Sequence, residues 1–412
     1  MGETSAAGGV IEVHKSIMGP REPRPRTVQS KRLEDYPGIP IVYRDVAKRL
    51  SSPLLMGPPI CDELIALVCH VFTEEEAALV RHLSGLSGRS AADLARAERR
   101  PLEDIQPVLD RLALQKRVIV SSGPDNRKRY WLLPLLPGMF EMLFIGESAD
   151  SLTDWHRRLA GLFEALYETG YNTDYQLATP MVRYLPVGKT IDAHPMALPS
   201  DRLEVVLDRF QAFGVGQCQC RMSMQLLGQG CGKPLGNCTV MGQWAKHGIQ
   251  QGWLKRVTKK NVLEIKREAE SHGLVTWMMN VEATKGHASC SCCGCCCKAM
   301  RIVNQFNAPG LIAPPHFLPR VDRALCRCCG KCAKNCPMGA IAVDTQAKTY
   351  RHLTERCIGC GLCLLACNDG RRAISMEPVP DYKLPYRSWF SLLAHAAPGM
   401  LKTVWKVWRK YR

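Results

Sequence analysis

Two runs of four cysteines near the C-terminus constrain this chain more than any other feature of the sequence. The first run has the spacing C-x2-C-x2-C-x3-C, precedes Pro337 and consists of Cys326, Cys329, Cys332 and Cys336. The second run repeats this spacing at Cys357, Cys360, Cys363 and Cys367. Three thiolates on one tight loop can hold three corners of a cubane iron–sulfur cluster, whereas the fourth cysteine of each run reaches the other cluster. The spacing therefore predicts two [4Fe–4S] clusters.

The crossed fourth ligand defines the two ligand sets that we expect. One cluster is assigned to Cys326, Cys329, Cys332 and Cys367. The other is assigned to Cys336, Cys357, Cys360 and Cys363. Zinc is the weaker alternative, because zinc sites favour separate Cys-x2-Cys pairs over runs of four. Disulfides are not expected in a chain of 21 cysteines whose first ten residues do not read as a signal peptide.

The region around these cysteines, residues 320–378, resembles the bacterial two-cluster ferredoxins. Three glycines fit the need of the backbone to pass close to the inorganic core, namely Gly330, Gly359 and Gly361. The second run departs from the family in having Asn368 where proline is usual, and Cys328 is an additional thiol. Neither difference changes the spacing. The resemblance implies a ferredoxin-like βαβ module that transfers single electrons.

A second group of ten cysteines lies upstream and is too dense for an ordinary core. It consists of Cys218, Cys220, Cys231, Cys238, Cys290, Cys292, Cys293, Cys295, Cys296 and Cys297. If residues 290–297 are extended, their side chains alternate between two faces. One face then carries Cys290, Cys292 and Cys296, and the other carries Cys293, Cys295 and Cys297. Each face would complete a cluster whose other ligands come from the four earlier cysteines, Cys218, Cys220, Cys231 and Cys238. We therefore expect one or two further [4Fe–4S] clusters; a zinc site is the alternative, although it would leave six thiols unused.

The order of these motifs resembles a class of uncharacterised 4Fe–4S-binding proteins of anaerobes. The shared features are a Cys-x-Cys-Arg run at Cys218–Arg221, a later cysteine pair, a Cys-Cys-x-Cys-Cys run, an N-terminal winged-helix-like segment and the C-terminal ferredoxin module. The likeness spans approximately residues 60–370. It implies iron–sulfur clusters without naming a substrate.

The length predicts a chain of several domains, since 412 residues exceed what one small ferredoxin needs. We expect the chain as a whole to be α+β. We expect an extended basic arm at 1–58, a winged-helix-like domain at 59–140, a helical cysteine-rich iron–sulfur domain at 141–304, a proline-rich linker at 305–325, a two-cluster ferredoxin domain at 326–380 and an amphipathic tail at 381–412.

Residues 60–135 have the pattern of a winged helix. Capping boxes begin two helices after Thr73 and Ser90, a third helix is expected over 101–115, and the turn at Gly123–Asn126 joins the strands of a hairpin wing. Acidic side chains on the third helix oppose contact with phosphates, namely Glu103, Asp104 and Asp110. Basic side chains on the wing favour DNA, namely Arg127, Lys128 and Arg129. We expect a packing or docking module, and nucleic acid is not the expected partner.

The C-terminal tail has an aromatic side and a basic side. On a helical wheel the first side carries Leu401, Val404, Trp405, Trp408 and Tyr411. The opposite side carries mainly Lys402, Lys406, Arg409 and Lys410. Pro398-Gly399 would separate this helix from the apolar residues 389–397 and give a bent anchor. Three alternatives stay open: packing on the protein's own core, an anionic membrane surface, or a partner groove.

The formal charge of +17 favours an anionic partner. Four clusters with their thiolates would lower this charge to roughly +9. A basic protein suits an acidic protein, an anionic membrane surface or nucleic acid, and charge does not choose among them. No apolar stretch is long enough to predict a spanning helix. We expect a cytoplasmic protein, on the inner face of the membrane if the tail binds lipid.

The function that these patterns favour is electron transfer through several clusters to or from a partner oxidoreductase. Lys331 and Lys334, beside the first run, would raise the potential of its cluster. No catalytic nucleophile–base group occurs, and Gly214-x-Gly216 lacks the rest of a nucleotide fingerprint, so no nucleotide cofactor is expected. The chain is expected to be an electron carrier or oxidoreductase subunit, not a free-standing enzyme. The alternatives are a redox-sensing transcriptional regulator and a reductase with an exposed upstream cluster.

Overall fold

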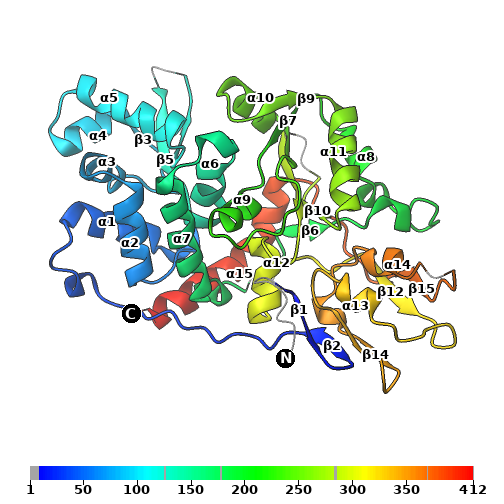
Figure 1. Cartoon of the computed structure of the whole chain (residues 1–412). Helices are drawn as coiled ribbons and strands as arrows, with labels where there is room; N and C mark the ends of the chain where they lie inside the picture. The colour runs from blue at the N-terminus through cyan, green and yellow to red at the C-terminus, as the bar shows by residue number, and fades with distance from the viewer. Residues whose placement is uncertain (1–8, 125–126, 177–178, 283–284, 369, 412) are drawn as a thin grey trace. The chain divides into compact units, whose positions relative to one another are not determined.

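The structure is a computed structural model that describes residues 9–124, 127–176, 179–282, 285–368 and 370–411 (Figure 1). The chain divides into two units. The helical unit contains residues 26–175 and the end of the chain from residue 402. The cysteine unit contains the residues up to 25 and residues 176–401. Both helices and sheets are present, so the expected α+β class is confirmed.

The helical unit begins with residues that we expected to belong to an extended arm. Its helices are α1 (Ile41–Leu50), α2 (Asp62–Val71), α3 (Glu74–Val80), α4 (Ala91–Glu98), α5 (Leu102–Asp110), α6 (Phe140–Phe144) and α7 (Asp154–Glu168). The expected arm at 1–58 is therefore wrong in part, because α1 lies within it. Val46, Ala47 and Leu50 recur at helical spacing and are buried, so α1 has an apolar face that an extended arm would expose.

Residues 73–132 form three helices and a small sheet. The Thr73 hydroxyl accepts a hydrogen bond from the Glu76 N–H at 3.3 Å, and the Glu76 carboxylate accepts one from the Thr73 N–H at 2.9 Å. This reciprocal cap begins α3 as the sequence predicted, and a similar cap begins α4. Three strands pair antiparallel in the order β3-β5-β4, namely β3 (Arg89–Ser90), β4 (Ile119–Ser122) and β5 (Arg129–Leu132). Residues 125 and 126 of the expected turn lie outside the described residues.

A six-stranded antiparallel sheet forms the centre of the cysteine unit (Figure 1). Its order is β6-β10-β11-β8-β7-β9, with β6 (Val182–Tyr184), β7 (Phe213–Gly216), β8 (Cys238–Gly242), β9 (Lys255–Val257), β10 (Val275–Met279) and β11 (Gly286–Cys292). The expectation of a helical domain at 141–304 is therefore wrong for this part. The strands are short, and most paired strands are separated by other elements, so no local periodicity reveals that they pair.

Helices accompany this sheet and complete its core. They are α8 (Leu203–Leu207), α9 (Gln219–Leu226), α10 (Gln243–Gln250), α11 (Lys259–Ser271) and α12 (Lys298–Phe306). Val206 of α8 and Val262 of α11 are buried in one apolar cluster with Met241 and Met278 of the sheet. The sheet and these helices fix the segments that carry the upstream cysteines.

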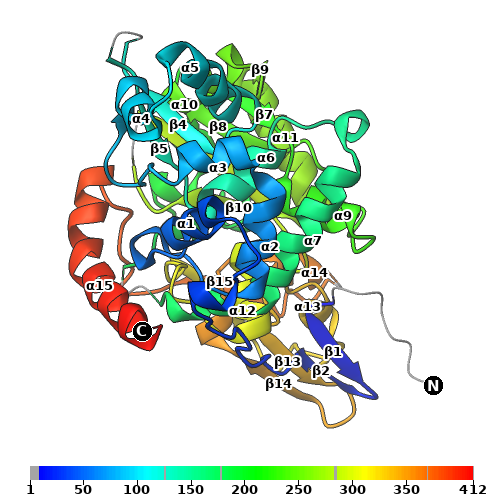
Figure 2. The same cartoon turned by 90° about the vertical axis from the view of Figure 1, so that its left-hand side faces the viewer.

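The N-terminal residues pair with the C-terminal cysteine region. The hairpin of β1 (Ile11–His14) and β2 (Ile17–Pro20) extends the pair β13 (Ile341–Asp344) and β14 (Thr349–His352) into a sheet of order β1-β2-β13-β14 (Figure 2). Met18 lies opposite Val343 in this pairing and is buried. Residues 11–14 and 17–20 of the expected arm are therefore strands. β2 pairs with the edge of β13 and so satisfies backbone groups that the edge strand would otherwise leave unpaired.

The cysteine-rich C-terminal region has the strand and helix order expected of a ferredoxin module. β12 (Phe317–Val321) pairs antiparallel with β15 (Ile374–Pro378), and two short helices lie between them, α13 (Lys331–Lys334) and α14 (Leu362–Ala366). β12 lies inside the expected linker at 305–325. The linker boundary is therefore wrong, since the module begins with β12 despite Pro319.

The chain ends in one continuous helix, α15 (Trp389–Lys410), which includes Pro398. The expected break at Pro398-Gly399 is absent, and Leu392, Ala396 and Val407 of this helix are buried. Among the described residues, no helix combines the length and apolar character needed to cross a bilayer.

Within the helical unit, Asp174 gathers three partners at the end of the chain. Its carboxylate accepts a hydrogen bond from Arg26 Nε at 3.0 Å and is also bound by Lys410 and the Tyr411 hydroxyl. The Asp174 side chain is only 7% exposed, so its charge depends on these partners.

Replacing Asp174 with Ala should lower the free energy of unfolding by about 1–3 kcal/mol. The reason is that Arg26 and Lys410 lose their shared counter-charge. Urea-induced unfolding of the full chain, followed by circular dichroism, measures the change. Asp45→Ala is the control, because its carboxylate is 41% exposed and lies 3.7 Å from Arg81; it should cost less than about 0.5 kcal/mol. Equal losses in the two variants would contradict a role for the buried carboxylate.

Candidate metal centres

One predicted ligand set of the C-terminal region lines a single cavity. The wall of this cavity includes Cys336, Cys357, Cys360 and Cys363, which come from both cysteine runs. Gly359 turns the chain here with a φ of +64°, and a Cβ on it would lie 2.3 Å from the Phe317 carbonyl oxygen. The left-handed turn and this close approach both require glycine. The structure thus brings Cys336 to the second run, as the crossed arrangement needs.

Without a bound metal, burial disfavours the charged thiolate form of these cysteines. It raises the pKa of the Cys357 thiol to about 12, with the Gly359 N–H opposing and the Cys336 thiolate adding to the rise. Burial and the Cys336 thiolate also raise the pKa of Cys360. Backbone N–H groups point at the sulfurs, from Gly359 to Cys357 Sγ at 3.4 Å and from Ala340 to Cys336 Sγ at 3.2 Å. Such donors stabilise thiolates that a cluster holds.

The other predicted set lies in a neighbouring part of the same module. Burial raises the pKa of the Cys332 thiol to about 12, and the charges of Cys326 and Cys329 add to this rise. Cys326, Cys332 and Cys367 contact one apolar cluster, which also contains Cys328. The additional thiol Cys328 lies 4.0 Å from Cys326 Sγ.

Tyr350 provides a test of whether clusters fit this module. Its ring is buried, and within the described chain its hydroxyl has no hydrogen-bond partner. Burial raises the pKa of this hydroxyl, and thiolates of both runs, among them Cys363 and Cys332, add to the rise. A buried hydroxyl without a protein partner but surrounded by cysteines fits a missing sulfur acceptor. The residues therefore fit two cubane clusters.

Arg356 is a candidate tuning residue that our sequence reasoning missed. It is buried, and its Nε donates to the Met338 carbonyl at 3.0 Å. Burial raises the pKa of Cys336, whereas nearby amide N–H groups and the Arg356 charge act in the opposite direction. Lys331 and Lys334, which we expected to tune a cluster, are exposed. The position of Arg356 directly before Cys357 was the available signal.

The upstream cysteines are arranged differently from the expected alternation. β11 carries Cys290 and Cys292 and then ends, and the Cys297 N–H donates to the Cys293 carbonyl at 3.1 Å across a turn. Because residues 293–297 are not extended, the alternation of faces does not apply beyond β11. The expected sets are therefore wrong: Cys296 joins Cys293 and Cys295, while Cys297 does not.

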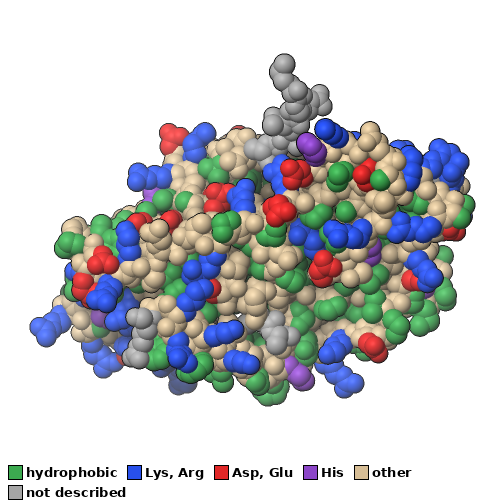
Figure 3. Space-filling view, turned by 90° about the horizontal axis from the view of Figure 1, so that it is seen from below, with side chains coloured by type: hydrophobic (Ala, Val, Ile, Leu, Met, Phe, Trp, Pro, Cys, Tyr) green, Lys and Arg blue, Asp and Glu red, His purple; other side chains and the backbone are tan. Residues whose placement is uncertain are grey.

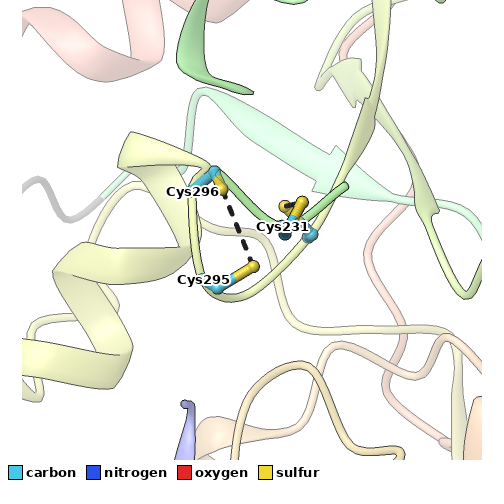
Figure 4. Close-up of side chains that lie close together, drawn as sticks. Cys231, Cys295 and Cys296 are labelled. Carbon is cyan, nitrogen blue, oxygen red and sulfur yellow. Dashed lines mark hydrogen bonds between the residues drawn. The ribbon is translucent and has the colours of Figure 1, made fainter. Parts of the chain in front are cut away.

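Four thiols form a tight group at this turn (Figure 4). Cys295 and Cys296 come from the turn before α12, and Cys231 comes from the loop between α9 and β8. The Sγ atoms of these three residues and of Cys293 all lie within 4.8 Å of one another. Hydrogen bonds from the three neighbouring thiols hold the pKa of Cys293 well below its ordinary value.

The remaining six upstream thiols lie near one another as a second, looser group. Cys297 shares hydrogen bonds with Cys220 and Cys292, and Cys238 shares one with Cys290. The charge of Cys218 acts on both Cys290 and Cys292. The sequence named all ten residues, but it could not divide them into these groups.

Two buried cations lie among the upstream thiols. Arg221 is 2% exposed; burial would lower its pKa, but the charges of Cys218, Cys293 and Cys292 raise it above its ordinary value. Lys266 is 1% exposed, and burial lowers its pKa to about 8 against the opposite effect of nearby thiolates. Neither cation forms an ion pair with a carboxylate among the described residues. Buried charges need counter-charges, so the thiolates have to supply them.

The looser group shares its apolar surroundings with the C-terminal module. One buried cluster contains Cys292 and Cys297 of the upstream group together with Cys360, and Cys336 packs against it. The buried Tyr184 belongs to the same cluster. Burial raises the pKa of its hydroxyl, and the charges of Cys297 and Cys292 add to this rise. The hydroxyl therefore lies close to the sulfurs that a cluster would use.

Asn304 and Gly294 fix the contact between the upstream turn and the C-terminal module. Asn304 Nδ2 donates to the Gly294 carbonyl at 3.1 Å and to the Pro337 carbonyl at 2.9 Å. A Cβ on Gly294 would lie 1.8 Å from the Pro337 oxygen, so this contact requires glycine.

The comparisons with known proteins agree with the C-terminal assignment. Residues 318–368 match the family of 4Fe-4S dicluster domains. The chain is 35% identical over 102 residues to the electron transport protein HydN of Escherichia coli K12, which covers 22% of this chain and 55% of HydN. HydN of E. coli O157:H7 gives the same values. The chain thus spans about half the length of the curated relatives it matches. No solved structure matches it. The chain contains a ferredoxin-type 4Fe–4S dicluster domain.

Replacing Cys336 with Ala should remove first the cluster held with Cys357, Cys360 and Cys363. We expect a loss of about four irons per chain, measured by iron and sulfide analysis of anaerobically purified protein. Cys328→Ala is the matched control, because Cys328 is buried nearby but belongs to neither predicted set, and it should retain all its iron. Loss of only the cluster assigned to the first run would contradict the crossed pairing.

Replacing Arg356 with Gln should lower the reduction potential of the same cluster by about 30–100 mV. A buried positive charge stabilises the reduced cluster, which is the more negative form, and glutamine removes that charge. An EPR-monitored redox titration measures the shift. Arg351→Gln removes an exposed charge from β14 and should leave the potential within a few millivolts. Equal shifts in both variants would show that net charge, and not the buried guanidinium, sets the potential.

Proposed function

We propose that this protein relays single electrons through several [4Fe–4S] clusters to or from a partner oxidoreductase. The observation that carries the proposal is the shared apolar cluster that joins Cys292 and Cys297 to Cys336 and Cys360. A cluster bound near Cys292 and Cys297 and a cluster bound near Cys336 and Cys360 would lie within one continuous apolar core. The second cluster of the dicluster domain would extend this series. Iron–sulfur clusters supply reversible one-electron chemistry when bound.

The similarity to HydN, described as an electron transport protein, supports the same function. The protein's own residues would hold and tune the clusters. Backbone N–H groups donate to the thiolates, Arg356 places a buried charge next to Cys336, and the surrounding apolar side chains keep water away.

One further cluster is assigned to the looser upstream group. Its six thiols exceed the four that a cubane needs, and Cys220, Cys292 and Cys297 share direct hydrogen bonds. Arg221, Lys266 and the Tyr184 hydroxyl would balance and hydrogen-bond such a cluster. We propose that Cys220, Cys292 and Cys297 supply three ligands of this cluster, and that Cys218, whose charge acts on Cys292, supplies the fourth.

The partner that best fits the surface is an acidic redox protein. Lys and Arg outnumber Asp and Glu by 17 in the chain, and Figure 3 shows many basic side chains on one face. The exposed side chains of Trp405 and Trp408 on α15 offer an apolar contact for this partner. An anionic membrane surface is the alternative for α15. The reducing conditions that such cysteines need support a cytoplasmic location.

The second candidate function is a redox-sensing regulator. Three helices and a three-stranded sheet in the order β3-β5-β4 support a winged-helix class for residues 73–132. Glu103 and Asp104 are exposed at the start of α5, the helix that would enter a DNA groove. Their charge opposes phosphate contact, so docking is the role we propose for this module.

An EPR redox titration of the full chain, with iron and sulfide analysis, tests the electron-transfer proposal. We expect about twelve irons per chain and signals that appear and disappear reversibly with potential. Clusters that reduce irreversibly would contradict it. In the same preparation, binding to a fragment of the gene's own promoter should match binding to random DNA at physiological salt. Roughly hundredfold tighter binding to the promoter would favour the regulator instead.

A further inference from the structure

Cys231, Cys293, Cys295 and Cys296 have the geometry of a mononuclear site. The Cys231 and Cys293 sulfurs are 3.9 Å apart, and those of Cys295 and Cys296 are 3.7 Å apart. A tetrahedral zinc ion with Zn–S bonds of about 2.3 Å places its four sulfurs about 3.8 Å from one another. The two measured separations agree with this value, and no pair in the group exceeds 4.8 Å.

A cubane cluster requires a wider arrangement. Each thiolate of a cubane binds a different iron, so the four sulfurs surround a core of eight atoms and lie roughly 6 Å apart. The four thiols at this turn are too close together to enclose such a core. They are also too far apart for disulfides, whose sulfurs are about 2 Å apart, and all four are free.

We propose that these four cysteines bind one structural zinc ion, separate from the iron–sulfur relay. The ligands complete a closed tetrahedron, which leaves no open position for catalysis. Cys293 and Cys296 are buried, and Met224, Ala269 and Leu274 surround them as an apolar shell. A closed, apolar site with four thiolate ligands is typical of zinc that stabilises a fold.

The charge around this site supports the assignment. Zinc with four thiolates carries a net charge of about −2. The buried Arg221 lies next to Cys293 and has no carboxylate partner among the described residues, so its guanidinium offsets part of this charge. Its Nη1 also donates to the Ser291 carbonyl at 2.6 Å, which holds it beside β11.

The zinc ion would link the turn after β11 to the loop that carries Cys231. Cys231 is separated by 62 residues from Cys293, and the metal would join its loop to the turn that follows β11. The turn carries Gly294, whose carbonyl is bound by Asn304 at 3.1 Å. Zinc would therefore help to hold the upstream thiols against the dicluster domain without itself carrying electrons.

Metal analysis of the full chain, purified anaerobically from cells supplied with both iron and zinc, tests the assignment. We expect about one zinc per chain in the unaltered protein and less than about 0.1 in Cys231→Ser. Cys69→Ser, which alters a half-buried thiol of α2, should retain its zinc. Cys238→Ser, in the looser group, should also retain zinc. X-ray absorption at the zinc edge should show four sulfur neighbours at about 2.3 Å.

Several results would overturn the proposal. They are an unaltered protein without zinc, a ferric signal from a mononuclear iron–sulfur site, or a Cys231→Ser variant that keeps its zinc and loses about four irons. These outcomes are independent of the electron-transfer proposal, because the EPR signals of the dicluster domain report on that function. A protein that contains zinc but shows no reversible cluster signals would support the structural zinc site and contradict the electron-transfer proposal.

Discussion

The concentration of thiolate charge inside an apolar core is the constraint on which the cysteine unit depends. Eighteen predicted ligands lie within the segments 218–297 and 326–367, and burial raises the pKa of many of them. Such a core is stable only when metals and buried cations balance the thiolates. Arg221 and Lys266 serve the upstream groups, and Arg356 serves the C-terminal module.

The scaffold achieves this by pairing segments that are distant in sequence. β8 and β11 are neighbours in the six-stranded sheet, and this pairing brings Cys238 close to Cys290. The hairpin of β1 and β2 covers the edge of β13, where the end of the Met18 side chain lies 2.5 Å from the position that a Cβ on Gly330 would take. Binding metal would therefore stabilise pairings that short strands alone secure weakly. We expect metal loss to loosen the cysteine unit more than the helical unit.

Sequence reasoning recovered the features that depend on local spacing. The cysteine runs and the caps at Thr73 and Ser90 are set by residues a few positions apart. It missed the six-stranded sheet and the strands at 11–14 and 17–20, because these strands are short and several of their partners, such as β13 for β2, lie far away in the sequence, so the pairing leaves no local period. It also misplaced Cys296 and Cys297, since alternation assumes an extended backbone and the chain turns after Cys292. Arg356 was overlooked because its burial depends on the tertiary fold.

The turn after β11 separates neighbouring cysteines into two chemistries. Cys292 and Cys297 face the looser group and the apolar cluster shared with Cys360, whereas the three cysteines between them group with Cys231. A chain that must place a redox cluster beside a second cluster needs a rigid backbone there, because electron tunnelling rates fall steeply with distance. The zinc ion that we propose on the other side of the same turn would supply that rigidity and, having no accessible redox change, could not divert an electron. In this proposal, adjacent thiols of one motif would have two roles: some would bind the structural zinc ion, and others would bind a cluster of the electron relay.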